Sequence, residues 1–202
     1  KGNLLHVDET DANIKGRKGY VWVFSNMETV IYLYRESREG SVLKEMLVDF
    51  NGVLVSDFYT AYDSIACPQQ KCLIHLIRDI NEDIIKNPFD DELKELGRNF
   101  TQLLAPIIDT VDAFGLKRRH LHKHKSKVNV FFDKITRAEF KSEYASNFQR
   151  RLLKYRDKLF IFLDYDGVPW NNNNAEYAIK HFVYLRDVIG GTSTAKGIQE
   201  YL

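Results

Sequence analysis

The sequence predicts an α/β protein in which a mixed β-sheet is flanked by helices. Two observations carry this prediction. Over residues 1–87, short β-branched and aromatic runs alternate with helical patterns, whereas apolar residues recur at helical spacing throughout 88–165. A chain of 202 residues is long enough for one core with an inserted subdomain. We therefore expect the sheet to come first and a helical insertion to follow it.

The first strand is predicted at Leu4–Val7, and it is expected to end at the carboxylate of Asp8. The same pattern returns at Val53–Val55, where Asp57 follows the strand. Each acid alone is explained by a polar turn, in which Asp is common. Ligands of open α/β sheets, however, bind at the carboxyl ends of strands. The repetition of the pattern favours a functional site at these ends.

The segments between and after these two strands complete the predicted sheet. Two β-type runs, Tyr20–Phe24 and Thr29–Tyr34, are joined by a short polar link, which predicts an antiparallel hairpin that extends the sheet. A helix is expected to run from an N-cap at Ser41 to about Asp49. A further strand is predicted at Lys71–Ile74, leading directly into another helix.

The region 88–165 contains a basic segment, residues 117–127, with six Lys/Arg, three His and no acid. Such a segment is by default a solvated loop, and we expect it to be exposed and mobile because six like charges cannot be buried unpaired. In a DNA-binding enzyme the same cations would contact phosphates, and both interpretations remain open. The candidate DNA-binding residues are Lys117, Arg118, Arg119, Lys123, Lys125 and Lys127. The aromatic residues of Phe131–Phe162 predict one core helix.

The end of the chain predicts a helix that carries a third acid. Asn171–Asn174 can cap a helix that begins near Ala175 and contains Glu176. Glycines at 190–191 are expected to end it. Because the chain begins without Met and stops inside an apparently helical pattern at 198–202, we expect it to be a piece of a longer protein.

Composition limits the compartment and the kind of partner. The formal net charge is +1, so a nucleic-acid partner would have to be met by local patches. Two cysteines, Cys67 and Cys72, favour a reducing compartment over a disulfide framework. No apolar run reaches the length of a membrane span and no secretory signal opens the chain. We expect a cytoplasmic protein without membrane contact.

Two strand-end carboxylates and one on a helix are the ligands that a two-metal site needs. Hard oxygen ligands suit Mg²⁺ or Mn²⁺. Two such ions clamp the attacking and leaving oxygens of a phosphodiester. The paired Cys/His spacing of structural zinc sites does not occur in the sequence. The pattern therefore predicts two Mg²⁺ or Mn²⁺ ions as cofactors.

Five motifs together carry a family resemblance that spans the chain in order. They are L-H-V-D-E-T at 5–10, V-L-V-S-D-F-Y-T-A-Y at 53–62, K-C-L-I-H-L-I-R-D at 71–79, N-N-N-N-A-E-Y-A-I-K at 171–180 and I-G-G-T at 189–192. The chain resembles the DDE transposases of bacterial insertion sequences, most closely the insertion-sequence-sixty-six type. The resemblance implies a ribonuclease H-like fold with Asp8, Asp57 and Glu176 as the catalytic and metal-binding triad. It also implies a catalytic core formed by 1–87 and 166–202, interrupted by a helical insertion at 88–165.

The resemblance implies further site residues and partners. Cys72 and His75 would support the active site, although a buried Cys and a capped His at a strand–helix junction is the ordinary explanation of this pair. Asn173 and Lys180 would be supporting residues on the last helix. The implied partner is double-stranded DNA, as transposon ends and target. A homodimer or higher oligomer on DNA, in the nucleoid-associated cytoplasm of a bacterium or archaeon, is expected.

Two departures from the family pattern keep alternatives open. Asn171 stands where the family usually has an acid, and Tyr177 stands where an Arg commonly follows the Glu. The leading hypothesis is the catalytic domain of a DNA transposase that cleaves and joins transposon ends. One alternative is a nuclease or resolvase of the same fold that only hydrolyses DNA. The other is a catalytically impaired or domesticated DNA-binding remnant.

Overall fold

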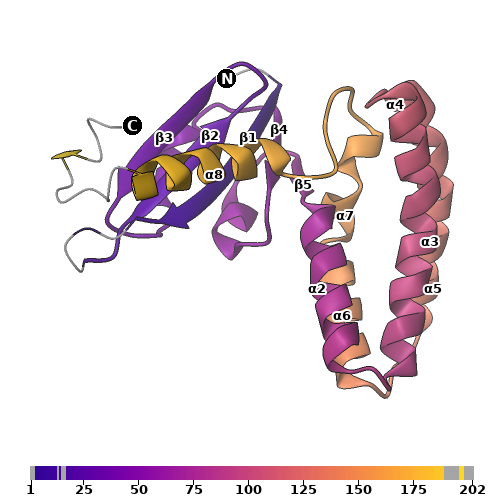
Figure 1. Cartoon of the computed structure of the whole chain (residues 1–202). Helices are drawn as coiled ribbons and strands as arrows, with labels where there is room; N and C mark the ends of the chain where they lie inside the picture. The colour runs from indigo at the N-terminus through magenta and orange to yellow at the C-terminus, as the bar shows by residue number, and fades with distance from the viewer. Residues whose placement is uncertain (1–2, 13, 15–16, 189–195, 198–202) are drawn as a thin grey trace. The chain divides into compact units, whose positions relative to one another are not determined.

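The computed structural model describes residues 3–12, 14, 17–188 and 196–197 (Figure 1). The chain forms two compact units. Residues Lys1–Gln69 and Asn172–Leu202 form the first, here called the sheet unit, and Gln70–Asn171 form the second, the helical unit. The predicted end of the last helix at 190–191 and the helical pattern at 198–202 lie outside the described residues.

The sheet is mixed and five-stranded, with the order β3-β2-β1-β4-β5. The strands are β1 (Leu4–Asp11), β2 (Tyr20–Ser25), β3 (Val30–Arg35), β4 (Val53–Ser56) and β5 (Gln69–Lys71). β2 pairs antiparallel with both β1 and β3, and β1 pairs parallel with β4. The predicted hairpin and the predicted adjacency of the two acid-bearing strands are confirmed.

β1 is longer than predicted. Its parallel pairing with β4 ends at His6↔Val55, but its antiparallel pairing with β2 continues as far as Asp11↔Tyr20. The prediction that the strand ends at Asp8 is therefore wrong, because the bonds to β2 keep the backbone extended. Asp8 lies instead just beyond the parallel partner, beside the point where the chain leaves β4.

Helices cover both faces of the sheet. α1 (Ser41–Met46) and the 3₁₀ helix η1 (Thr60–Ser64) lie on one face, and α8 (Asn173–Val188) lies across the strands on the other (Figure 1). The α1 face buries Val7, Trp22, Phe24, Leu54 and Tyr62, among others. The α8 face buries Val21, Val23, Tyr34, Ala178 and Phe182. Because side chains alternate along a strand, Glu9, opposite Trp22, faces α1, whereas Asp8, opposite Val23, faces α8.

The predicted boundaries of two elements are wrong. Gly40, not Ser41, is the N-cap of α1, because the N–H groups of Leu43 and Lys44 both donate to the Gly40 carbonyl. The helix stops at Met46. β5 occupies 69–71 rather than 71–74, since the helix that follows it already begins at residue 73.

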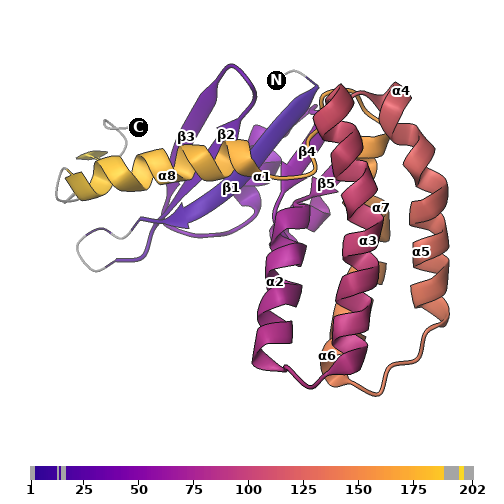
Figure 2. The same ribbon diagram turned by 45° about the vertical axis from the view of Figure 1, so that its right-hand side comes forward.

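The helical unit is built from four long helices that pack side by side (Figures 1 and 2). These are α2 (Leu73–Lys86), α3 (Asp91–Phe114), α5 (Lys125–Arg137) and α6 (Glu143–Lys154). The short elements are α4 (Arg118–Leu121), η2 (His122–His124), α7 (Arg156–Leu159) and η3 (Ile161–Leu163). No helix among the residues described is both long and apolar enough to cross a membrane.

The single helix predicted over 131–162 is wrong. α5 ends at Arg137, because the backbone of the next residue, Ala138, is extended, and α6 begins after Ser142. The Ser142 side chain accepts a hydrogen bond from the Ala145 N–H at 3.1 Å, which caps the new helix. The break also exposes Tyr144, which the aromatic pattern assigned to the core.

Candidate active site

The carboxylates of Asp8 and Asp57 are each held by a backbone N–H close to them in sequence. Oδ1 of Asp8 accepts from the N–H of Glu9 at 2.9 Å. Oδ1 of Asp57 accepts from the N–H of Tyr59, also at 2.9 Å, in the turn that follows β4. Because β1 and β4 are parallel neighbours, both acids follow the last paired residues of the two strands.

α8 brings Glu176 to this position through the buried side chain of Asn172. The Nδ2 atom of Asn172 donates to the Val7 carbonyl at 3.0 Å, and its Oδ1 lies 3.1 Å from Nδ1 of His6. Since Nδ2 is committed to the carbonyl, the network assigns the Nδ1 proton of His6 to the Oδ1 contact. The Glu176 N–H in turn donates to the Asn172 carbonyl at 3.1 Å. The start of α8 is thereby fixed to β1 at His6 and Val7, the two residues that precede Asp8.

Further contacts hold α8 along the sheet. The Tyr32 hydroxyl donates to the Ala178 carbonyl at 3.0 Å, and the rings of Tyr32 and Phe182 are 6.1 Å apart. The guanidinium of Arg186 donates to the Asp11 carbonyl at 3.0 Å. Glu176 therefore lies on a helix that is attached to the sheet before and after it.

The electrostatics of Asp8 show that the three predicted acids come together. The pKa of Asp8 is raised to about 8, mainly by burial and in addition by the negative charges of Asp57, Glu9 and Glu176. The hydrogen bond from the Glu9 N–H opposes part of this increase. The charges that act on Asp8 thus come from carboxylates on two strand ends and one helix. Their catalytic and metal-binding roles remain predictions.

The fourth acid, Glu9, was not singled out by the sequence. Its side chain is 2% exposed and lies on the α1 face of β1, where it accepts from Nε of Arg38 at 2.8 Å and from the hydroxyl of Tyr62. Burial raises the pKa of Glu9, although the hydrogen bonds of Tyr62 and Arg38 oppose the shift. If the strand had been extended beyond Asp8, the alternation of side chains along it would have placed Glu9 on the sheet face opposite to that of Asp8.

The donor set fits a hard divalent cation. The clustered side chains of Asp8, Asp57 and Glu176 offer only carboxylate oxygens, the ligands that Mg²⁺ and Mn²⁺ prefer. A buried carboxyl whose pKa is about 8 is one on which negative charge is unfavourable, and a bound cation would relieve this. The acids could therefore hold a metal ion.

The other predicted support residues occupy defined positions, but their roles remain predictions. In the helical unit, Cys72 is buried at the N-cap of α2 and His75 lies in the first turn. In the sheet unit, Asn173 is the first residue of α8, and the exposed Lys180 places its ammonium 5.4 Å from the Tyr177 ring centroid. Asn172, which makes the contacts to β1, was not predicted, because a run of four Asn residues does not distinguish its members.

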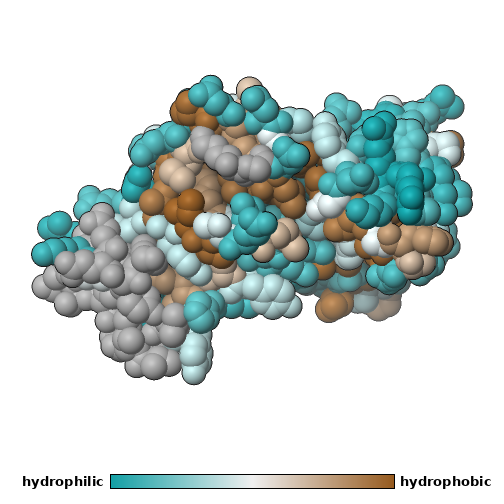
Figure 3. Space-filling model, turned by 90° about the horizontal axis from the view of Figure 1, so that it is seen from above, coloured by the Kyte–Doolittle hydropathy of each residue, from teal (hydrophilic) through white to brown (hydrophobic). Residues whose placement is uncertain are grey.

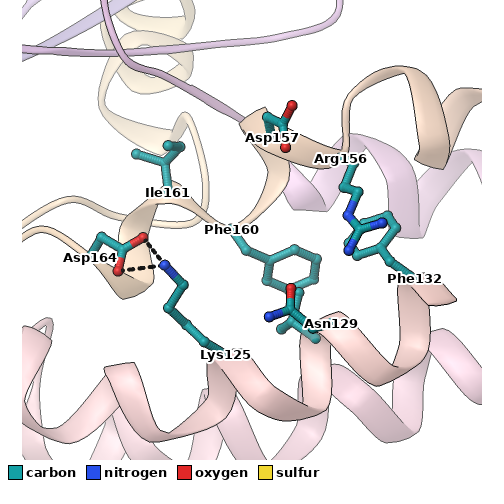
Figure 4. A pocket seen from close by; sticks show the side chains of 9 residues that line it. Lys125, Asn129, Phe132, Arg156, Asp157, Phe160, Ile161 and Asp164 are labelled. Carbon is teal, nitrogen blue, oxygen red and sulfur yellow. Dashed lines mark hydrogen bonds and ion pairs between the residues drawn. The ribbon is translucent and has the colours of Figure 1, made fainter.

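The basic segment 117–127 is helical, so the prediction of a loop is wrong. It comprises Lys117, α4, η2 and the first turn of α5. Leu121 is fully buried, and the buried His124 lies with Nε2 2.9 Å from the hydroxyl of Thr110. Asp164 accepts from Lys125 at 3.0 and 2.8 Å (Figure 4), and Asp166 accepts from the Arg118 N–H at 2.7 Å. The segment, which has no acid of its own, is therefore held in place by its buried residues and by Asp164 and Asp166, which lie far from it in the sequence.

The predicted exposure of this segment is confirmed for five of its six cations. Its exposed cations are Lys117, Arg118, Arg119, Lys123 and Lys127, whereas Lys125 is half-buried. In Figure 3, which views the molecule from above, the end of the helical unit that carries α4 is mainly hydrophilic. Among the described residues, no ion pair involves these five cations. They could contact an anion without first breaking an ion pair, although Nε of Arg119 donates to Nε2 of His120 at 2.9 Å.

The raised pKa of Asp8 predicts how stability depends on pH without metal. Between about pH 4 and pH 8 the folded chain holds a proton that the unfolded chain has lost, so the free energy of unfolding should fall as pH rises. The slope is at most about 1.4 kcal/mol per pH unit for one proton. Asp8→Asn should therefore be more stable than the wild type at pH 8 in chelator, and the difference should shrink toward pH 5. Urea unfolding at both pH values checks this, and an equal difference at both would contradict it.

Comparison with known proteins gives one match. The family model described as "Transposase IS66 family" matches residues 1–200, nearly the whole chain. No curated protein and no solved structure matches the chain. The match covers both units and includes all three predicted acids.

Proposed function

The chain belongs to the IS66 family of DDE transposases, and on that premise we propose that it is a catalytic domain that cleaves and joins DNA at transposon ends. The family is one of DNA-cleaving, DNA-binding enzymes that use divalent metal ions. The finer assignment to Asp8, Asp57 and Glu176 is supported by one observation above others. The charges of Asp57 and Glu176 both act on the buried carboxyl of Asp8, although the three residues come from distant parts of the chain.

The proposed fold of the catalytic core is ribonuclease H-like. The sheet order β3-β2-β1-β4-β5, with an antiparallel hairpin beside a parallel pair, supports this proposal. The proposed insertion, residues 88–165, lies within the helical unit and separates the first two acids from the third. In this arrangement β1 carries Asp8, the turn after β4 carries Asp57 and α8 carries Glu176.

The proposed mechanism assigns the protein mainly to positioning and electrostatics. Asp8, Asp57 and Glu176 would hold two Mg²⁺ or Mn²⁺ ions, which when bound supply activation of the nucleophile and stabilisation of the leaving oxygen of a phosphodiester. The N–H groups of Glu9 and Tyr59 orient the first two carboxylates. The contacts of Asn172 orient the third by fixing the start of α8.

A nicking and joining assay tests this function. The chain is incubated with a labelled duplex that carries the transposon end, with Mg²⁺, Mn²⁺ or chelator. Cleavage and transfer of the 3′-hydroxyl end to a second duplex, both lost in chelator, are expected. Cleavage without joining would favour a nuclease of the same fold. DNA binding without cleavage in either metal would favour a catalytically impaired remnant.

The exposed cations of the basic segment are proposed to contact the DNA backbone. Replacing Lys117, Arg118 and Arg119 together with Ala should reduce the salt dependence of DNA binding by about 2–3 units of the log–log slope. The three side chains are exposed and outside every ion pair of the described residues, so folding should be unaffected. Affinity measured between about 50 and 200 mM salt checks this prediction. Arg98, Lys134 and Arg137, which are likewise exposed and outside every ion pair of the described residues, provide a control of equal charge elsewhere in the helical unit when replaced together with Ala. An equal change in slope would contradict a specific role.

A further inference from the structure

Behind the acids, on the α1 face of β1, lies a partly buried polar network formed by Glu9, Arg38 and Tyr62. Arg38 comes from the loop between β3 and α1, and its guanidinium donates through Nε and one terminal nitrogen to Oε1 of Glu9. The hydroxyl of Tyr62, a fully buried residue, donates to the other oxygen of the same carboxylate. Both oxygens of Glu9 are thereby occupied, which fixes the plane of the carboxylate and the direction of Arg38.

The network continues from Arg38 to Asp57 through Tyr59. The guanidinium carbon of Arg38 lies 4.2 Å from the ring centroid of Tyr59, and the Tyr59 hydroxyl donates to the Arg38 carbonyl at 2.7 Å. The backbone N–H of Tyr59 is the group that donates to Oδ1 of Asp57 at 2.9 Å. Arg38 therefore contacts Tyr59 at two points, and Tyr59 contacts the carboxylate of Asp57.

The residue types suit a positioning role better than a stabilising one. A buried ion pair contributes little net stability compared with apolar residues of similar volume. The planar guanidinium, by contrast, can bond a carboxylate with two nitrogens and stack on an aromatic ring at the same time, which an ammonium cannot do. Arg38 uses both properties. The side chain is still 45% exposed, so burial of its charge is only partial.

We propose that Arg38, held in place by Glu9, is a positioning residue that fixes Tyr59 and, through the Tyr59 N–H, the orientation of the Asp57 carboxylate. This rests on the proposed function, in which Asp57 is a metal ligand. Outer contacts that orient a ligand typically change metal affinity by about 10- to 100-fold when they are removed. The loop between β3 and α1 is thereby assigned a role in metal binding, although it contributes no ligand.

The test compares Arg38→Ala and Arg38→Lys with the control Arg35→Ala in the full chain. Arg35 forms an ion pair with Glu45 at 3.3 Å on the surface, so the control removes an Arg–Glu pair that does not involve Asp57. The first readout is the exchange rate of the Tyr59 amide proton in the metal-free protein, measured by NMR. It should rise about tenfold in Arg38→Ala, less in Arg38→Lys, and not at all in Arg35→Ala. The second readout is Mn²⁺ binding by calorimetry, which should weaken about tenfold in Arg38→Ala.

Nicking kinetics supply the third readout. In the Arg38 variants kcat should fall while KM for the DNA stays unchanged. An unchanged Tyr59 exchange rate and unchanged Mn²⁺ affinity, with a raised KM, would overturn the proposal and assign Arg38 to direct contact with phosphate. If Arg38→Ala does not fold, Arg38→Lys and Glu9→Gln decide by the same readouts. A wild-type chain that binds Mn²⁺ but does not nick DNA would contradict the proposed function, whereas the exchange experiment would still test the positioning.

Discussion

Asp57→Asn should reduce metal-dependent nicking by about 10³-fold or more, with folding and most of the DNA affinity unchanged. The substitution keeps the shape of the side chain and an oxygen that can accept from the Tyr59 N–H, but it removes the charge that would hold the cation. Asp8→Asn and Glu176→Gln should reduce nicking in the same way. Single-turnover nicking of a labelled transposon end in Mg²⁺ gives the rate, and a binding measurement in chelator gives the affinity.

The matched control for these substitutions is Asp49→Asn. Asp49 is an exposed acid of the sheet unit whose φ is 59°, a left-handed conformation that Asn adopts readily. Its replacement removes one negative charge without altering the acid cluster, so nicking should continue at the wild-type rate. Wild-type activity in the Asp57→Asn chain would contradict the assignment of Asp57 as a metal ligand.

Asn172→Ala should lower the free energy of unfolding by about 2–4 kcal/mol, because the Val7 carbonyl and the His6 ring would each lose a buried hydrogen-bond partner. Nicking should also fall, by about 10- to 100-fold, since the start of α8 would no longer be fixed beside Asp8. Urea unfolding and the nicking rate measure the two effects.

A neighbouring Asn provides the control. Asn174 makes a 3.4 Å contact to His6 and a 3.0 Å contact to the sulfur of Met27, the latter at the surface. Asn174→Ala should therefore cost less than about 1 kcal/mol. Equal losses of stability in the two variants would mean that the buried contacts of Asn172 do not anchor α8.

The strands and the pairing of their acids could be predicted because their signals are local. Val53–Val55 is apolar and β-branched, and an Asp follows it, as at the first strand. The resemblance placed the third acid, which no local signal connects to the first two. The extent of β1 could not be predicted, because it depends on how far β2 accompanies it.

Other features depended on partners far along the chain. The composition of the basic segment predicts a loop. In the structure, Asp164 and Asp166 supply the acids that it lacks, because they accept hydrogen bonds from Lys125 and from the Arg118 N–H. From the sequence, Glu9 is predicted to be one more acid in a polar turn. In the structure it is buried against Arg38 and Tyr62, which lie 29 and 53 residues away. Periodicity describes one element at a time, whereas these contacts are made between elements.

The attachment of Asn172 to His6 joins residues 166 positions apart, and this has a consequence for biosynthesis. A ribosome makes β1 to β4 long before it makes α8. The apolar side chains of Val21, Val23 and Tyr34 therefore remain uncovered until α8 has been synthesised and has packed on the sheet. Contacts of such sequence separation form slowly and leave apolar surface exposed meanwhile. A chain truncated before α8 would therefore lack the proposed metal ligand Glu176 and would also be prone to aggregate, because α8 supplies both this acid and the cover of the sheet.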